Sequence, residues 1–149
     1  MTNKKKKEQI ISSLSEMISG IEKRTKEYLE EFDMNAAFCF SDDEESRKKY
    51  LLSYNKFSAD LDVYIEKAEQ KMALISALIC TTDNECDKDL TEDLVGHFNR
   101  YVQFSVSVSN FVESSKKAFQ NRESSFRPTV AVSHARDLLA AIQNYKKNI

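Results

Sequence analysis

The sequence predicts an all-α protein whose four helices form an elongated up-down-up-down bundle. Residues that break helices are scarce, because the 149 residues include only two glycines and one proline. Apolar residues recur at steps of three and four along most of the chain, which is the spacing of one buried helix face. The length suits a single helical-bundle domain, residues 1–149, with a core large enough to fold without a disulfide or a metal.

The first helix is predicted from about Lys6 to Phe32, and residues 1–6 before it are expected to be a disordered basic tail. The apolar stripe of this helix begins at Ile10 and continues to the end of the segment. Gly20 interrupts the stripe at a cost of about 1 kcal/mol relative to alanine. We therefore expect a neighbouring helix to approach the backbone closely at this glycine.

The connection that follows, residues 34–40, is unusually apolar for a loop. Phe38 and Phe40 are its largest side chains, and two interpretations of them are open. The two rings either fold over the end of the bundle or form an exposed aromatic patch on which a partner docks.

The second helix is predicted from about Asp43 to Cys80 and is the longest of the four. Ser41 and Glu44 have the spacing of a capping box, which marks a helix start. The apolar positions after it average about 3.6 residues per step, the period of a straight helix. These positions are Tyr50, Tyr54, Phe57, Leu61, Tyr64, Ala68, Met72, Ile75 and Ile79.

The third helix is predicted from about Leu90 to Gln120, and the fourth from about Pro128 to Lys147 with the proline in its first turn. Residues 102–108 alternate between apolar and polar side chains, which is also the period of a half-buried strand. We favour a helix there, because a lone strand would have no partner elsewhere in the chain.

The composition argues against several classes of function and of cellular location. Lysine and arginine number 22 against 24 aspartate and glutamate, and this balance makes nucleic acid an unlikely partner. No window approaches the length of a membrane span, and the lysines at positions 4–7 are not followed by the apolar run of a signal peptide. Three cysteines, an odd number, fit a reducing compartment. We therefore expect a soluble cytoplasmic protein.

We expect neither a metal nor a cofactor. Cys80, Cys86 and His97 could be combined into a zinc site, but their spacing matches no structural zinc motif and a fourth ligand is not evident. Two glycines are also too few for a glycine-rich phosphate loop. In the predicted topology, the N-terminal lysines should instead meet the acidic segment 83–89 at one end of the bundle, together with Lys146 and Lys147.

The predicted helices differ in length, and this mismatch indicates a binding surface. The fourth helix would span about 30 Å and the second about 55 Å, so the fourth cannot cover the whole groove between its neighbours. Large apolar side chains should remain uncovered there and bind a partner helix or a second copy of the chain. The expected interface residues are Met72, Ile75, Ile79, Leu94 and Phe98, with Ile10 and Leu14 beside them, and Phe38 and Phe40 in the apolar connection.

One pair of residues suggests a catalytic function. Arg127 and His134, separated by six residues, resemble the Arg-x(4–6)-His motif of the HEPN family, all-helical domains that include metal-independent ribonucleases. The resemblance implies that Arg127 holds the scissile phosphate and that His134 assists attack by the ribose hydroxyl, at a site shared across a dimer. Pro128 departs from the family pattern, which usually has a polar residue after the arginine. The alternative interpretation is structural, with His134 flanking the core beside Leu138.

The sequence favours a non-enzymatic protein–protein interaction module that docks a partner on an apolar helix groove. By analogy, small helical proteins of this kind are bacterial or phage adaptors, inhibitors, immunity proteins or chaperones. Two alternatives stay open. One is a HEPN-type ribonuclease that uses Arg127 and His134, and the other is a structural subunit of a larger assembly.

Overall fold

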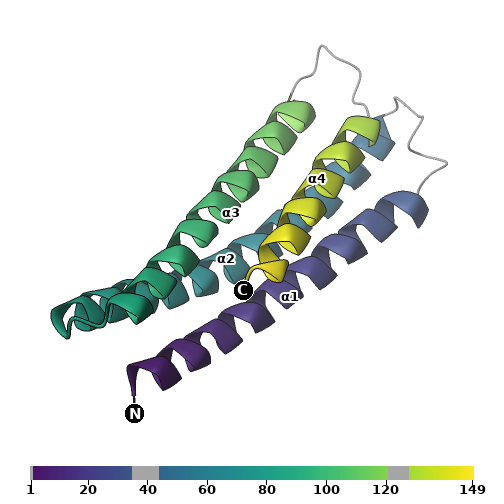
Figure 1. Cartoon of the computed structure of the whole chain (residues 1–149). Helices are drawn as coiled ribbons and strands as arrows, with labels where there is room; N and C mark the ends of the chain where they lie inside the picture. Colours follow the sequence, from purple (N-terminus) through teal and green to yellow (C-terminus); the bar gives the residue numbers. More distant parts are fainter. Residues whose placement is uncertain (1, 35–43, 121–127) are drawn as a thin grey trace.

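The computed structural model describes residues 2–34, 44–120 and 128–149, and over these residues the chain is an all-α bundle of four helices without a strand. The helices are α1 (Asn3–Met34), α2 (Glu44–Asn84), α3 (Lys88–Gln120) and α4 (Pro128–Lys147). The most extensive contacts join each helix to two neighbours, in the order α1, α2, α3, α4 and back to α1. Figure 1 shows the resulting rod, in which successive helices run in opposite directions and α4 ends well short of the N-terminus of α1.

The predicted fold class is therefore confirmed, and α2 is the longest helix as expected. The N-terminus differs from the prediction, because residues 3–6 are helical and not a disordered tail. Two contacts hold this first turn in place. The hydroxyl of Thr2 accepts a hydrogen bond from the backbone N–H of Lys5 at 3.3 Å, and the amide of Asn3 donates to Glu85 at 2.8 Å.

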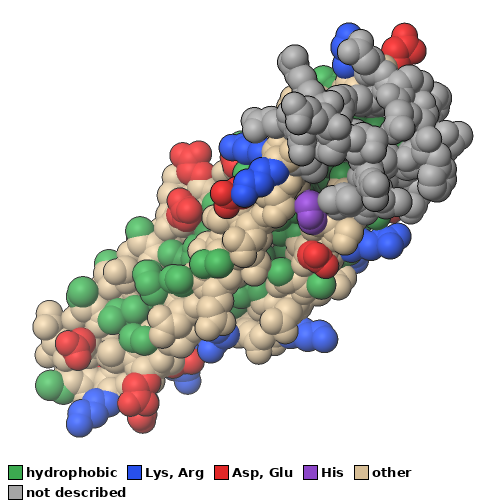
Figure 2. Space-filling model, turned by 90° about the horizontal axis from the view of Figure 1, so that it is seen from above, with side chains coloured by type: hydrophobic (Ala, Val, Ile, Leu, Met, Phe, Trp, Pro, Cys, Tyr) green, Lys and Arg blue, Asp and Glu red, His purple; other side chains and the backbone are tan. Residues whose placement is uncertain are grey.

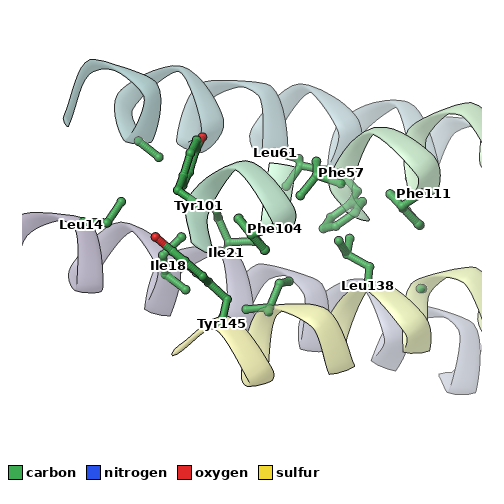
Figure 3. Packing of buried hydrophobic residues seen from close by; sticks show 14 of the residues in the cluster. Leu14, Ile18, Ile21, Phe57, Leu61, Tyr101, Phe104, Phe111, Leu138 and Tyr145 are labelled. Atoms are coloured by element: carbon green, nitrogen blue, oxygen red, sulfur yellow. The ribbon is translucent and has the colours of Figure 1, made fainter. Parts of the chain in front are cut away.

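A continuous core runs along the rod and receives side chains from all four helices. Tyr28 of α1 stacks on Phe57 of α2 with 4.4 Å between ring centroids, and Phe104 of α3 stacks on Tyr145 of α4 with 4.8 Å. Figure 3 shows how the labelled side chains of the four helices point into one shared interior. The largest fully buried side chains are Tyr28, Phe57, Leu14, Ile18, Ile21, Leu61, Ile75, Leu94, Leu138, Ile142 and Thr25.

Two details of the helices answer questions raised by the sequence. The alternating residues 102–108 are helical, as we predicted, with Phe104 buried and Val102 and Val106 about half exposed. At Gly20, a Cβ atom would lie only 2.6 Å from Cε1 of Tyr64, so α2 does approach α1 closely at this glycine. Gly20 therefore serves the contact between α1 and α2.

The turn between α2 and α3 is a Schellman motif followed by a helix cap. The backbone N–H of Cys86 donates to the carbonyl of Asp83, and that of Asp87 donates to the carbonyl of Thr82, both at 3.0 Å. Cys86 has a left-handed φ of 58°, which is unusual for a residue other than glycine. Oδ1 of Asp87 then accepts from the N–H of Leu90 at 3.3 Å and caps α3.

Candidate functional site

The last turn of α4 lies beside the middle of α1. Nζ of Lys146 is 3.6 Å from Oε2 of Glu22, and this ion pair marks the level at which α4 ends. From Asn3 to Ile18, about 24 Å of α1 continues beyond that level. The expectation that Lys146 meets the acidic segment 83–89 is therefore wrong, because α4 is too short to reach it.

A groove with a volume of about 750 Å³ opens beyond this point, between α1 and α3. Most of its wall comes from α1, while α3 contributes one histidine and Ile149 borders the groove after the end of α4. We call it the α4-end groove. Its lining residues are Lys7, Glu8, Ile11, Ser12, Ser15, Glu16, Ser19, His97 and Ile149.

Small side chains dominate the α1 wall of the groove. Ser12, Ser15 and Ser19 are spaced by three and four residues, so they lie on one side of α1. Their size leaves the helix backbone accessible to close approach, and their hydroxyls tolerate either a polar or an apolar neighbour. Ile11 and Ile149, both partly buried against the core, provide the apolar part of the surface. The groove can therefore accommodate a mixed polar and apolar helix face.

His97 borders the groove from α3 and is only 7% exposed. Nη2 of Arg100 lies 3.2 Å from Nδ1 of His97. Because arginine can only donate, Nδ1 must accept, and the ring proton resides on Nε2, 3.8 Å from Oδ1 of Asp93. Burial, and after it the charge of Arg100, lowers the pKa of His97. The imidazole is thus held in its neutral form.

An ion pair connects the two walls. The ammonium of Lys7 on α1 pairs with the carboxylate of Asp93 on α3, and this contact lowers the pKa of Asp93. The ion pair joins α1 and α3 directly, at a level that α4 does not reach. The ion pair therefore holds the two walls of the groove together at the end away from α4.

The apolar residues predicted to line the uncovered surface are not exposed. Met72, Ile75 and Leu94 are 4%, 0% and 0% exposed, and Ile79 and Phe98 are partly buried against the core. The prediction of exposure is wrong because α1, α2 and α3 bury these side chains among themselves where α4 is missing. Phe38 and Phe40 lie outside the residues that the structure describes.

The pair that resembles the HEPN motif is only half described, because Arg127 lies outside the described residues. His134 is half-buried on α4 and borders a cavity of about 230 Å³ between α3 and α4, together with Asp137 and Leu138. Its Nδ1 is buried, with no hydrogen-bond partner among the described residues. The place beside Leu138 agrees with the structural interpretation, and the catalytic role stays a prediction.

Other surfaces offer fewer specific features. Cys80 and Cys86 are exposed free thiols, and within residues 2–34, 44–120 and 128–149 no cluster of three or more side chains could hold a metal ion. None of the helices in these ranges is long and apolar enough to cross a membrane. Figure 2 shows hydrophobic side chains interspersed with polar ones along one face of the rod. The large apolar residues that remain exposed are Leu52, Val63, Leu74, Val95, Val102 and Val106.

Comparison with known proteins adds no functional information, because no protein family, curated sequence or solved structure matches the chain. None of the predicted interface residues that the structure describes lines the α4-end groove. The length mismatch of the helices indicated where a groove would lie. The lining could have been recognised from the serines at positions 12, 15 and 19, because they form a row of small side chains beside the apolar stripe of α1.

Proposed function

We propose that this protein is a non-enzymatic interaction module that binds a helix of another protein in the α4-end groove. The observation that supports this function is the length of α1 and α3 beyond the end of α4. A four-helix bundle normally fills this position with its fourth helix. Here α4 stops beside Glu22, and a groove bordered by small side chains continues its path.

The dimensions of the groove suit a helix. The α1 residues that line the groove run from Lys7 to Ser19, about 18 Å, and a helix of about 12 residues would extend along them. The mixed lining also favours a partner that binds and dissociates over a permanent subunit, because obligate interfaces are more hydrophobic. Whether the module acts as an adaptor, an inhibitor or a chaperone would then follow from what that partner does.

Site-specific photo-crosslinking tests the proposal. A photoreactive amino acid at Ser15 should yield one discrete adduct in a lysate of the native host, because Ser15 lines the groove. The matched control places the same amino acid at Ser109, an exposed serine of α3 that does not line the groove. Adding Ser12→Arg should remove the Ser15 adduct by filling the groove. Equal adducts at both positions, or an adduct that Ser12→Arg leaves unchanged, would contradict the proposal.

A HEPN-type ribonuclease is the second candidate, favoured by the position of His134 beside a cavity with polar lining from Asn110, Ser114 and Asp137. Purified protein should then cleave RNA without added metal, and His134→Ala should abolish cleavage. Ser133→Ala, at an exposed neighbouring position, is the matched control. Absence of cleavage at micromolar protein, or cleavage that His134→Ala does not change, eliminates this candidate.

A further inference from the structure

The surface of α1 that α4 contacts continues into the open groove. Glu8, Ser15 and Glu22 are each seven residues apart, close to two helical turns, so they lie along one side of α1. Glu22 contacts α4, whereas Glu8 and Ser15 line the α4-end groove. A helix that continued the path of α4 would therefore meet Glu8 as Lys146 of α4 meets Glu22.

These two glutamates differ in their ion pairs. Glu22 pairs with Lys26 at 3.1 Å and with Lys146 at 3.6 Å, and these lysines, Lys26 first, lower its pKa. Glu8 forms no ion pair with any residue that the structure describes, and the same holds for Glu16, which also lines the groove.

Among the residues that line the groove, the positive charge is already neutralised. Lys7 pairs with Asp93, and the His97 ring is neutral. The open groove therefore presents two unpaired carboxylates, those of Glu8 and Glu16, beside small serines and two isoleucines. A partner with basic side chains would complement this charge.

We propose that the groove binds a basic amphipathic helix, antiparallel to α1, that places lysine or arginine against Glu8 and Glu16. This inference rests on the proposed function and adds the chemistry of the partner. The contact between Lys146 and Glu22 serves as the template, because Glu8 lies about 21 Å further along the same side of α1. The face of the partner toward Ser12, Ser15 and Ser19 should carry small or apolar residues, because these serines permit close approach.

Two synthetic helical peptides with the same Ala/Leu stripe test this charge preference. One peptide carries lysine on both flanks of the stripe, and the other carries glutamate at the same positions. Fluorescence anisotropy should show that the full chain binds the lysine peptide about tenfold more tightly, and that added salt reduces the difference. The double variant Glu8→Lys and Glu16→Lys should reverse the preference.

A charge-matched control separates the groove from general electrostatic attraction. Glu45→Lys with Glu66→Lys changes the net charge by the same amount at exposed positions on α2, and it should leave the preference for the lysine peptide unchanged. Fusing each peptide after Ile149 provides a second measurement, since tethering raises the effective concentration of the helix. The lysine fusion should raise the melting temperature and the glutamate fusion should not.

The results distinguish this inference from the proposed function. Equal binding of both peptides, with Ser15→Arg weakening both, overturns the charge preference and retains the groove as a helix site. If Ser15→Arg changes neither binding nor the melting temperature of the fusions, both the inference and the proposed function fail. A wild-type dimer in light scattering that Ser15→Arg dissociates would also overturn the inference, because the occupant would then be a second copy of the chain.

Discussion

Replacing Gly20 by alanine tests the close contact between α1 and α2. Alanine is favoured over glycine inside a helix by about 0.8–1 kcal/mol, so the substitution alone should stabilise the fold. The new Cβ, however, would lie 2.6 Å from Cε1 and 3.0 Å from Cζ of Tyr64, where ordinary contacts begin at 3.4 Å. Overpacking of this kind costs about 1–3 kcal/mol. The Tyr64 ring is only partly buried and its tip can swing outward, which places the cost near 1 kcal/mol.

The two effects should therefore nearly cancel in the wild-type background. In a Tyr64→Ala background the steric cost disappears, and Gly20→Ala should raise the free energy of unfolding by about 1 kcal/mol. Urea unfolding followed by far-UV circular dichroism measures all four corners of this double-mutant cycle. Gly96→Ala is a matched control, because its Cβ would meet only the flexible Arg100 side chain, at 3.2 Å from Nη1. A coupling energy below about 0.3 kcal/mol would refute the contact.

Three further predictions concern stability. Cys86→Gly should raise the free energy of unfolding by about 1 kcal/mol in the same urea assay, because glycine removes the left-handed strain at φ 58°, whereas Cys86→Ala should leave it unchanged. Tyr145→Phe should leave the free energy of unfolding unchanged, because the Tyr145 hydroxyl is buried with no partner among the described residues. Tyr54→Phe should lower it by about 1 kcal/mol, because the Tyr54 hydroxyl donates to the carbonyl of Val112 at 3.4 Å. The pKa of His97 is lowered in the folded state. The neutral ring therefore contributes fully to stability above the pKa of histidine in the unfolded chain, about 6.5, and this contribution is lost as the pH falls below that value. His97→Gln should flatten this pH dependence, and an unchanged slope between about pH 7 and 5 would contradict the role of the neutral ring.

The helices themselves follow from local information. Their apolar spacing and the scarcity of glycine and proline are properties of neighbouring residues, which is why α4 begins and ends where it was predicted. α2 continues to Asn84, beyond its predicted end at Cys80, because the Schellman motif that ends it depends on Cys86 in a conformation that its residue type does not indicate. The strand-like alternation at residues 102–108 was resolved correctly, because the rest of the chain offered no strand to pair with.

Burial at the end of the bundle was harder to infer. Met72, Ile75 and Leu94 appeared to need a fourth helix as cover, but their cover comes from α1, α2 and α3. Periodicity identifies which face of a helix is apolar, and it contains no information on how closely three helices approach once the fourth has ended. The ion pair between Lys7 and Asp93 likewise joins residues that are far apart in sequence.

The sequence alone determined four long helices, their order and the unequal reach of α4, because these depend on short-range propensity and on segment length. The tertiary structure decided which side chains border the open groove. It is lined by polar residues such as Ser12, Ser15 and Glu8, while Met72, Ile75 and Leu94 are buried. Buried apolar area stabilises the fold, and polar side chains remain in contact with water at little cost.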